Sequence, residues 1–193
     1  MAEIKRCGWS TSDPIYIDYH DRQWGVPLHD DRCLFEFLVL ECAQAGLSWL
    51  TILKRRHGYR RAFDDFEPAK VARYDSAKVR RLLSDRGIIR NRLKIASAIN
   101  NAKAFLNVQE QFGSFDRYIW KFVGGKPLDG LRRRLADIPA RTALSDKISA
   151  DLKDRGFSFV GSTIVYAHMQ ATGMVNDHIL TCFRHDELQR GGR

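Results

Sequence analysis

The sequence has no long hydrophobic run. None of its apolar segments approaches the roughly 20 residues that a bilayer-spanning helix needs, and residues 1–6 are too short and polar for a signal peptide. It also contains no internal repeat and no low-complexity tract. We therefore expect a soluble, cytoplasmic protein without a membrane partner.

Cysteine is scarce as well. The four cysteines lie far apart and form no tight pattern, at Cys7, Cys33, Cys42 and Cys182. Thiols in a reducing compartment seldom form disulfides. These cysteines are therefore expected to be buried thiols or metal ligands.

Positive charge is in excess. Lys and Arg number 32 against 23 Asp and Glu, which gives a net charge of +9. Such a balance is typical of proteins that bind nucleic acid or another anionic surface.

The 44% hydrophobic fraction can build a core. We expect a single domain of two closely packed helical lobes over residues 1–185, followed by a polar, frayed tail over 186–193.

The apolar residues recur at helical spacing, and no segment alternates as a strand would. The sequence therefore predicts an all-α fold, with a long loop over 126–142 and a last short helix that holds His178 and Cys182. The other expected helices span residues 31–45, 49–57, 68–72, 77–84, 92–111, 115–123, 146–155 and 162–172.

A carboxylate interrupts the apolar stripe of the first long helix. The helical neighbours of Glu41 are all apolar or small: Leu34, Phe37, Leu38 and Ala45. Gly46 can end this helix, and Ser48 can cap the next one, with Trp49 in its first turn. A carboxylate beside an aromatic face suits a flat, polar, cationic ligand. The alternative, which this stretch alone favours, is that Glu41 pairs with a buried arginine or caps a backbone.

Residues 78–94 hold seven basic side chains and one acid, and they predict a helix, a turn and a second helix. Backbone N–H groups in such a turn can hold a DNA phosphate, and nearby arginines add attraction. The candidates for this contact are Gly87, Ile88, Ile89, Arg90 and Arg92. The element is similar to a helix-hairpin-helix, although it has one glycine where Gly-x-Gly is usual. The alternative is a solvated basic face; a second basic run over 54–61 favours nucleic acid.

A metal site can join the two ends of the chain. His178 and Cys182 share one face if their segment is helical, and Cys7 and His20 lie at the other end of the sequence. Two cysteines and two histidines would form a closed, structural zinc site. The alternative, favoured by spacing alone, is buried thiols and ordinary surface histidines.

Taken together, these residues resemble the DNA-3-methyladenine glycosylase I family over nearly the whole chain. The resemblance rests on an ordered set of motifs: Cys7-Gly8-Trp9, Tyr16-x-x-Tyr19-His20-Asp21, Trp24-Gly25-Val26-Pro27, Leu40-Glu41, Gln44-Ala45-Gly46-Leu47-Ser48-Trp49, Gly87-Ile88-Ile89-Arg90, Phe159-Val160-Gly161 and Val175-Asn176-Asp177-His178. Two positions depart from the pattern: Cys42 stands where Gly is expected and Ser162 where Thr is expected.

The resemblance implies a helix-hairpin-helix glycosylase fold whose termini are joined by one structural Zn²⁺, held by Cys7, His20, His178 and Cys182. It places Glu41 as the catalytic residue and Trp9, Tyr16, Tyr19 and Trp49 around the base. The expected partner is double-stranded DNA containing alkylated bases, bound by a monomer. Trp24, Trp120, Phe35 and Phe105 are assigned to the core.

The implied reaction is base-excision repair. The enzyme flips out 3-methyladenine and hydrolyses its N-glycosidic bond, which leaves an abasic site. No lysine is placed for Schiff-base chemistry, so we expect no strand cleavage. The main rival is a non-catalytic helix-hairpin-helix DNA-binding module; a zinc hydrolase and a pure interaction protein are the others.

Overall fold

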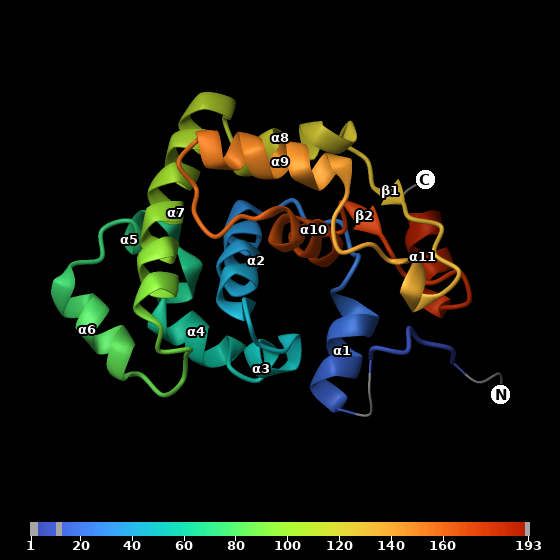
Figure 1. The fold of residues 1–193 in the computed structure, drawn as a ribbon, viewed down its shortest axis with the longest axis horizontal. Coiled ribbons are helices and arrows are strands. Elements are labelled where there is room, and N and C mark those ends of the chain that lie inside the picture. Colours follow the sequence, from blue (N-terminus) through green and yellow to red (C-terminus); the bar gives the residue numbers. More distant parts are fainter. Residues whose placement is uncertain (1–3, 11–12, 192–193) are drawn as a thin grey trace.

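The computed structural model describes residues 4–10 and 13–191, and this part of the chain is mostly helical (Figure 1). The predicted fold class is therefore confirmed. The elements are α1 (Pro14–Arg22), α2 (Asp31–Gln44), α3 (Trp49–Leu53), α4 (Arg56–Ala62), η1 (Asp64–Phe66), α5 (Pro68–Val71), α6 (Ser76–Ser84), α7 (Arg92–Phe112), α8 (Phe115–Trp120), η2 (Lys121–Val123), β1 (Leu128–Asp129), η3 (Leu135–Asp137), α9 (Ala143–Asp154), α10 (Ser162–Ala171), β2 (Val175–Asn176) and α11 (Phe183–Gly191).

Helix α2 lies at the centre of the fold and packs against α7 and α10 (Figure 1). Its residues from Leu34 to Ala43 are all buried. Phe35 stacks edge-on against Phe105 of α7, with ring centroids 5.2 Å apart, and both are fully buried. This accounts for an almost continuous apolar run in α2. The assignment of Phe35, Phe105 and Trp120 to the core is confirmed.

Capping residues fix the ends of α2 and α3, and two of them, Gly46 and Ser48, are the predicted ones. Asp30 caps α2 by accepting from the Cys33 N–H. Gly46 follows the helix with φ = +78°, a conformation that glycine adopts without strain. Ser48 caps α3 by accepting from the Thr51 N–H. The turn between the two helices therefore brings Glu41 and Trp49 to one place.

Two short strands depart from the expected all-helical pattern. β1 pairs in parallel with β2 and matches Leu128 with Val175. Each strand is two residues long, too short to produce a recognisable alternation in sequence. The pairing ties the predicted 126–142 loop to the segment that follows α10. No helix in the described ranges is both long and apolar enough to span a bilayer.

Three further local predictions differ from the structure. The helix expected over 49–57 is divided into α3 and α4, and Gly58 lies inside α4, where a side chain would collide with the Gly87 carbonyl. Residues 177–182 form turns, so the predicted short helix with His178 and Cys182 is wrong. Residues 183–191 form α11, so most of the expected polar tail is helical. Near the start of α11, His185 contacts the carboxylates of Asp129 and Asp186. Residues 192–193 lie outside the described ranges.

Candidate functional site

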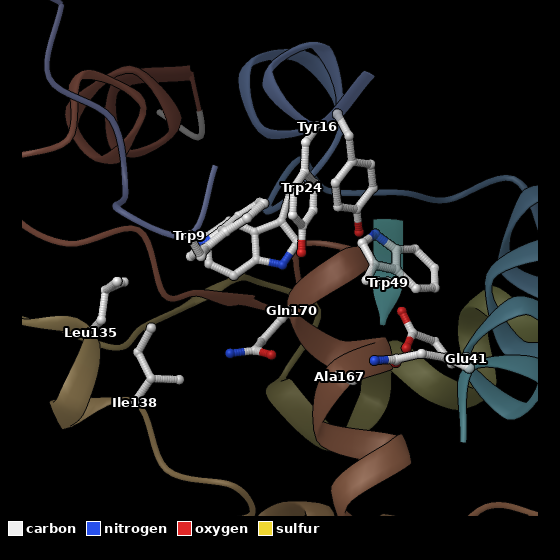
Figure 2. A pocket seen from close by; sticks show the side chains of 11 residues that line it. Trp9, Tyr16, Trp24, Glu41, Trp49, Leu135, Ile138, Ala167 and Gln170 are labelled. Atoms are coloured by element: carbon white, nitrogen blue, oxygen red, sulfur yellow. The ribbon is translucent and has the colours of Figure 1, made fainter. Parts of the chain in front are cut away.

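A pocket of about 400 Å³ opens between the N-terminal segment, α1, the end of α2, α3, the η3 loop and α10. In Figure 2, Trp49 and Glu41 form one side, Leu135 and Ile138 the opposite side, and Ala167 and Gln170 lie along α10 between them. Its lining residues are Trp9, Tyr16, Tyr19, Trp24, Glu41, Gln44, Trp49, Leu135, Ile138, Ala167 and Gln170. The pocket is thus aromatic with few polar groups, as small-molecule sites usually are.

Helix α1 supplies two of the aromatic side chains. Tyr16 and Tyr19 are three residues apart and therefore lie on one face. Trp9 packs across them with ring centroids 5.1 and 6.3 Å away, and Tyr19 meets Trp49 at 5.5 Å. Burial raises the pKa of both tyrosines, so their hydroxyls stay protonated and can donate hydrogen bonds. The four predicted base-binding residues are therefore brought together.

Glu41 lies in the last turn of α2 and is only 3% exposed. It has no hydrogen-bond or ion-pair partner among residues 4–10 and 13–191. Burial raises its pKa to about 8, so the free protein holds this carboxyl protonated at neutral pH. The alternative expectation, a partner arginine or a backbone cap, is therefore wrong for Glu41. An unpaired acid facing a pocket is a group that a ligand can complete.

Four buried side chains from the two ends of the chain meet beside this pocket. The ligand atoms of Cys7, His20, His178 and Cys182 all lie within 4.8 Å of one another. The Cys182 sulfur is 3.5 Å from His20 Nε2 and from His178 Nδ1, and the Cys7 sulfur is 3.5 Å from the same His178 nitrogen. This set of donors fits a metal ion in tetrahedral coordination.

The surroundings orient both histidines toward the cluster. The second nitrogen of His20 bonds Asp21 at 2.7 Å, and that of His178 bonds the Trp24 carbonyl at 3.0 Å. Asp21 is held in turn by Arg6. Such outer contacts fix the ring that presents a metal-binding nitrogen. The hydrogen bond between the Cys7 and Cys182 thiols lowers the pKa of Cys182 and raises that of Cys7. Cys182 is therefore the cysteine that loses its proton readily.

The predicted basic hairpin is present as α6, a turn over residues 85–91, and α7. The Gly87 N–H donates to Asp85 and the Ile89 N–H donates to the Tyr59 hydroxyl, so neither is free for a phosphate. Ile88 is 3% exposed and belongs to the core. Arg90 and Arg92 are exposed. The turn therefore has a packed base and a cationic outer side.

Several basic residues of the two runs pair with other groups of the protein. Lys94 of α7 donates to the Ala43 and Ala45 carbonyls and so caps α2 beside the pocket. Lys78 pairs with Asp64. In the second run, acidic partners hold Lys54, Arg56 and Arg60. The second run is therefore mostly structural, and the argument for nucleic acid that it supplied is weaker than expected.

Comparison with known proteins identifies this arrangement. The family model described as "Methyladenine glycosylase" matches residues 9–185. The chain belongs to the methyladenine glycosylase family. It is 49% identical to DNA-3-methyladenine glycosylase 1 of Escherichia coli, with 93% of this chain and 96% of that protein covered. It is 43% identical to the DNA-3-methyladenine glycosylase of Haemophilus influenzae, with 92% and 96% covered.

Solved structures of methyladenine glycosylases superpose closely. A crystal structure of 3-methyladenine DNA glycosylase I matches with a TM-score of 0.90 and 49% identity, covering 93% of this chain and 98% of that one. A Staphylococcus aureus structure, described as the structural basis of 3-methyladenine recognition, has a TM-score of 0.90, 38% identity and coverage of 94% and 97%. The family and fold that the resemblance implied are confirmed.

Some pocket residues of this methyladenine glycosylase were not predicted as site residues. Trp24 was assigned to the core, and it is 8% exposed, but one part of it lines the pocket. Gln44 begins the motif that ends at Trp49, and its position shortly after Glu41 could have indicated that it lines the pocket. Gln170, Leu135 and Ile138 carry no such signal, because only tertiary packing brings the η3 loop and α10 to the pocket.

The two departures from the family pattern lie outside the pocket lining. The Cys42 thiol is buried and donates to the Phe159 carbonyl at 3.3 Å. The Ser162 hydroxyl bonds the Ser145 hydroxyl at 2.8 Å, which joins the starts of α9 and α10. Neither side chain lines the pocket.

Proposed function

We infer that this chain is a DNA-3-methyladenine glycosylase that removes 3-methyladenine from alkylated double-stranded DNA in base-excision repair. The observation that carries this inference is Glu41, a buried acid without a partner in an aromatic pocket of a methyladenine glycosylase fold. A base within a duplex is out of reach, so the nucleotide is flipped into the pocket. The purine then lies among Trp9, Tyr16, Tyr19 and Trp49.

The pocket chemistry suits a cationic base. Methylation at N3 gives the adenine a positive charge, and aromatic faces attract such a ring by roughly 0.5–2 kcal/mol per good contact. A cation beside Glu41 favours the ionised carboxylate, so we expect the base to enter as Glu41 loses its proton. The carboxylate then accepts charge-assisted hydrogen bonds from the base. Selecting and holding the cation is the enzyme's main task.

The reaction needs little further activation. The bond between the sugar C1′ and the base breaks with its electron pair on the base, which leaves as neutral 3-methyladenine. Water adds its oxygen to C1′ and loses a proton, which gives an abasic site. No amine enters the reaction, so no strand cleavage follows. Absence of a borohydride-trapped covalent DNA complex is the expected result.

Arg90 and Arg92 contact the DNA backbone in this proposal, and the turn at Gly87, Ile88 and Ile89 sets their position. Their exposure supports the role. Phosphate contacts release counterions, so binding to random duplex DNA should weaken steeply as salt rises. Replacing Arg90 and Arg92 by Ala should reduce the salt slope by about 1 for each phosphate that the protein then leaves unneutralised. An unchanged slope would remove them from the interface.

The metal is Zn²⁺ and its role is structural. Two thiolates and two imidazoles leave no open position for substrate or water, which is typical of structural zinc. When bound, the ion would join Cys7, before α1, and His20, within α1, to His178 and Cys182, before α11. Elemental analysis of protein purified without chelator should give one zinc per chain. Folded, active protein without stoichiometric metal would contradict this.

The deciding experiment is chromatography of free bases released from methylated duplex DNA by the monomeric protein. We expect selective release of 3-methyladenine. Binding of the DNA without release of any base would favour the alternative, a non-catalytic helix-hairpin-helix module. No DNA affinity at low salt would contradict both.

A further inference from the structure

Gln170 on α10 reaches into the pocket from the side that lies between Glu41 and the η3 loop (Figure 2). Its neighbour on the same wall, Ala167, offers only a methyl group. Gln170 is therefore the hydrogen-bonding side chain that α10 presents to a bound base. The polarity that it presents depends on which end of its amide faces the pocket.

A buried carboxylate fixes the amide. The Gln170 Nε2 donates to Asp177 Oδ2 at 2.9 Å. Asp177 is fully buried and also accepts from Arg132 Nε at 2.8 Å and from the Tyr166 hydroxyl. A carboxylate paired with arginine only accepts, so the nearby Gln170 atom must be the nitrogen. The amide oxygen is consequently turned toward the pocket.

The carboxylate has little room to move. A side chain at Gly130 would collide with Asp177 Oδ1, and the Gly130 N–H donates to the Asn176 carbonyl at 2.9 Å. The Arg132 guanidinium also bonds the Tyr166 hydroxyl at 3.1 Å. The network therefore holds Asp177 from several sides, and Gln170 cannot reverse its amide without leaving a buried acceptor without one of its donors.

We propose that Gln170 is a specificity-determining residue whose side-chain oxygen, oriented by Asp177, accepts a hydrogen bond from the amino group at C6 of the base and disfavours a purine with a carbonyl there. This rests on the proposed function. 3-Methyladenine carries the amino group, whereas 3-methylguanine carries the carbonyl. If the Gln170 oxygen faces a carbonyl, neither oxygen receives a hydrogen bond. Leaving two buried acceptors without a donor is energetically costly.

The test measures kcat/KM for release of 3-methyladenine and 3-methylguanine from the same methylated DNA. The wild type should prefer 3-methyladenine. In Asp177→Asn, the new amide can donate, so Gln170 can reverse and present N–H to the base. We expect the preference to fall by about tenfold or more, the effect of a single polar contact. Gln170→Met, which removes the amide altogether, should lower the preference similarly.

A rescue variant and a matched control separate orientation from structure. In the double variant Asp177→Asn with Gln170→Glu, the amide at position 177 donates to the carboxylate at position 170. The other carboxylate oxygen then faces the pocket as an acceptor, so the preference should return. Tyr166→Phe removes another donor to the same carboxylate without changing Gln170. It should reduce thermal stability and leave the preference unchanged. Zinc content is measured for each protein, because loss of metal would lower both rates together.

The outcomes are distinct. A wild type that releases neither base contradicts the proposed function itself. A wild type that releases both bases equally, or a preference unaltered in Gln170→Met, contradicts the role of Gln170 alone. If Asp177→Asn does not fold, Gln170→Met still decides that role. Loss of preference in Gln170→Met without rescue in the double variant would contradict orientation by Asp177.

Discussion

Helix α2 holds two glutamates that are equally buried and behave in opposite ways. Glu36 is 4% exposed and accepts hydrogen bonds from Arg56 at 2.7 Å and from Arg60 at 2.8 and 3.0 Å. Glu41 is 3% exposed and has no such partner. The pKa of Glu36 is lowered by these arginines, which outweigh its burial, while burial alone raises that of Glu41.

This difference separates an acid that the protein itself satisfies from one that a ligand can complete. Both residues interrupt an apolar run, so the sequence pattern is the same. Glu36 satisfies its charge within the protein and joins α2 to α4. Glu41 faces the pocket, and its hydrogen-bonding capacity is left for a ligand to satisfy. A buried acid that lacks a partner and faces a cavity indicates a ligand-binding site, whereas burial alone does not.

The largest effect should come from Glu36→Ala. It leaves Arg56, whose side chain is 13% exposed, as an uncompensated cation near the core. Breaking a buried pair costs about 4 kcal/mol in the free energy of unfolding. Urea denaturation measures the loss, with exposed Glu110→Ala as the matched control, which should change stability by less than about 0.5 kcal/mol. Equal effects of the two variants would show that Glu36 is not a structural anchor.

Glu41→Gln should have the converse effect: it lowers activity without the loss of stability expected of Glu36→Ala. The amide keeps the shape but cannot become an anion beside the cationic base. We expect base release to fall by about 100-fold, equivalent to roughly 2.7 kcal/mol. Single-turnover release measures this, and Glu36→Gln serves as the control, since per folded molecule it should keep its activity. Near-wild-type release by Glu41→Gln would remove Glu41 from the mechanism.

The pH dependence of stability should differ between the wild type and Glu41→Gln. The folded-state pKa of Glu41, about 8, lies above the ordinary value of 4.5. The folded protein therefore retains a proton that the unfolded chain has lost, and stability falls as pH rises through the interval between these two values. From pH 5.5 to 7.0 the wild type should lose about 2 kcal/mol relative to Glu41→Gln. Parallel stability curves of the two proteins would contradict the raised pKa.

The smallest effect concerns the two arginines that hold Glu36. Arg60 has a side chain 47% exposed, so water screens its pair, whereas Arg56 is mostly buried and also donates to Gln23. Arg60→Ala should cost about 1 kcal/mol or less. Arg56→Ala should cost more, because Glu36 then depends on one exposed partner. Denaturation of both variants tests the order, and a reversed order would assign the anchoring role to Arg60.

Capping and helical periodicity predicted much of the fold. Asp30, Gly46 and Ser48 act locally, and each determines a helix end within a few residues of itself. Helix α7 extends from Arg92 to Phe112, close to its expected limits. β1 and β2 could not be predicted, because their pairing joins segments nearly fifty residues apart and each is only two residues long. The turn over 177–182 escaped prediction for a similar reason: distant contacts determine its shape.

The sequence by itself determined the helical class and the family, since these depend on residue type and order along the chain. Through that resemblance it also named the candidate site residues Cys7, His20, His178, Cys182 and Glu41. Only the tertiary structure decided which charges remain without partners. Lys94 and Arg60 read as surface cations, yet one caps α2 and the other holds Glu36. Hydrogen bonds act over about 3 Å, so a residue's chemical role depends on neighbours that chain order does not specify.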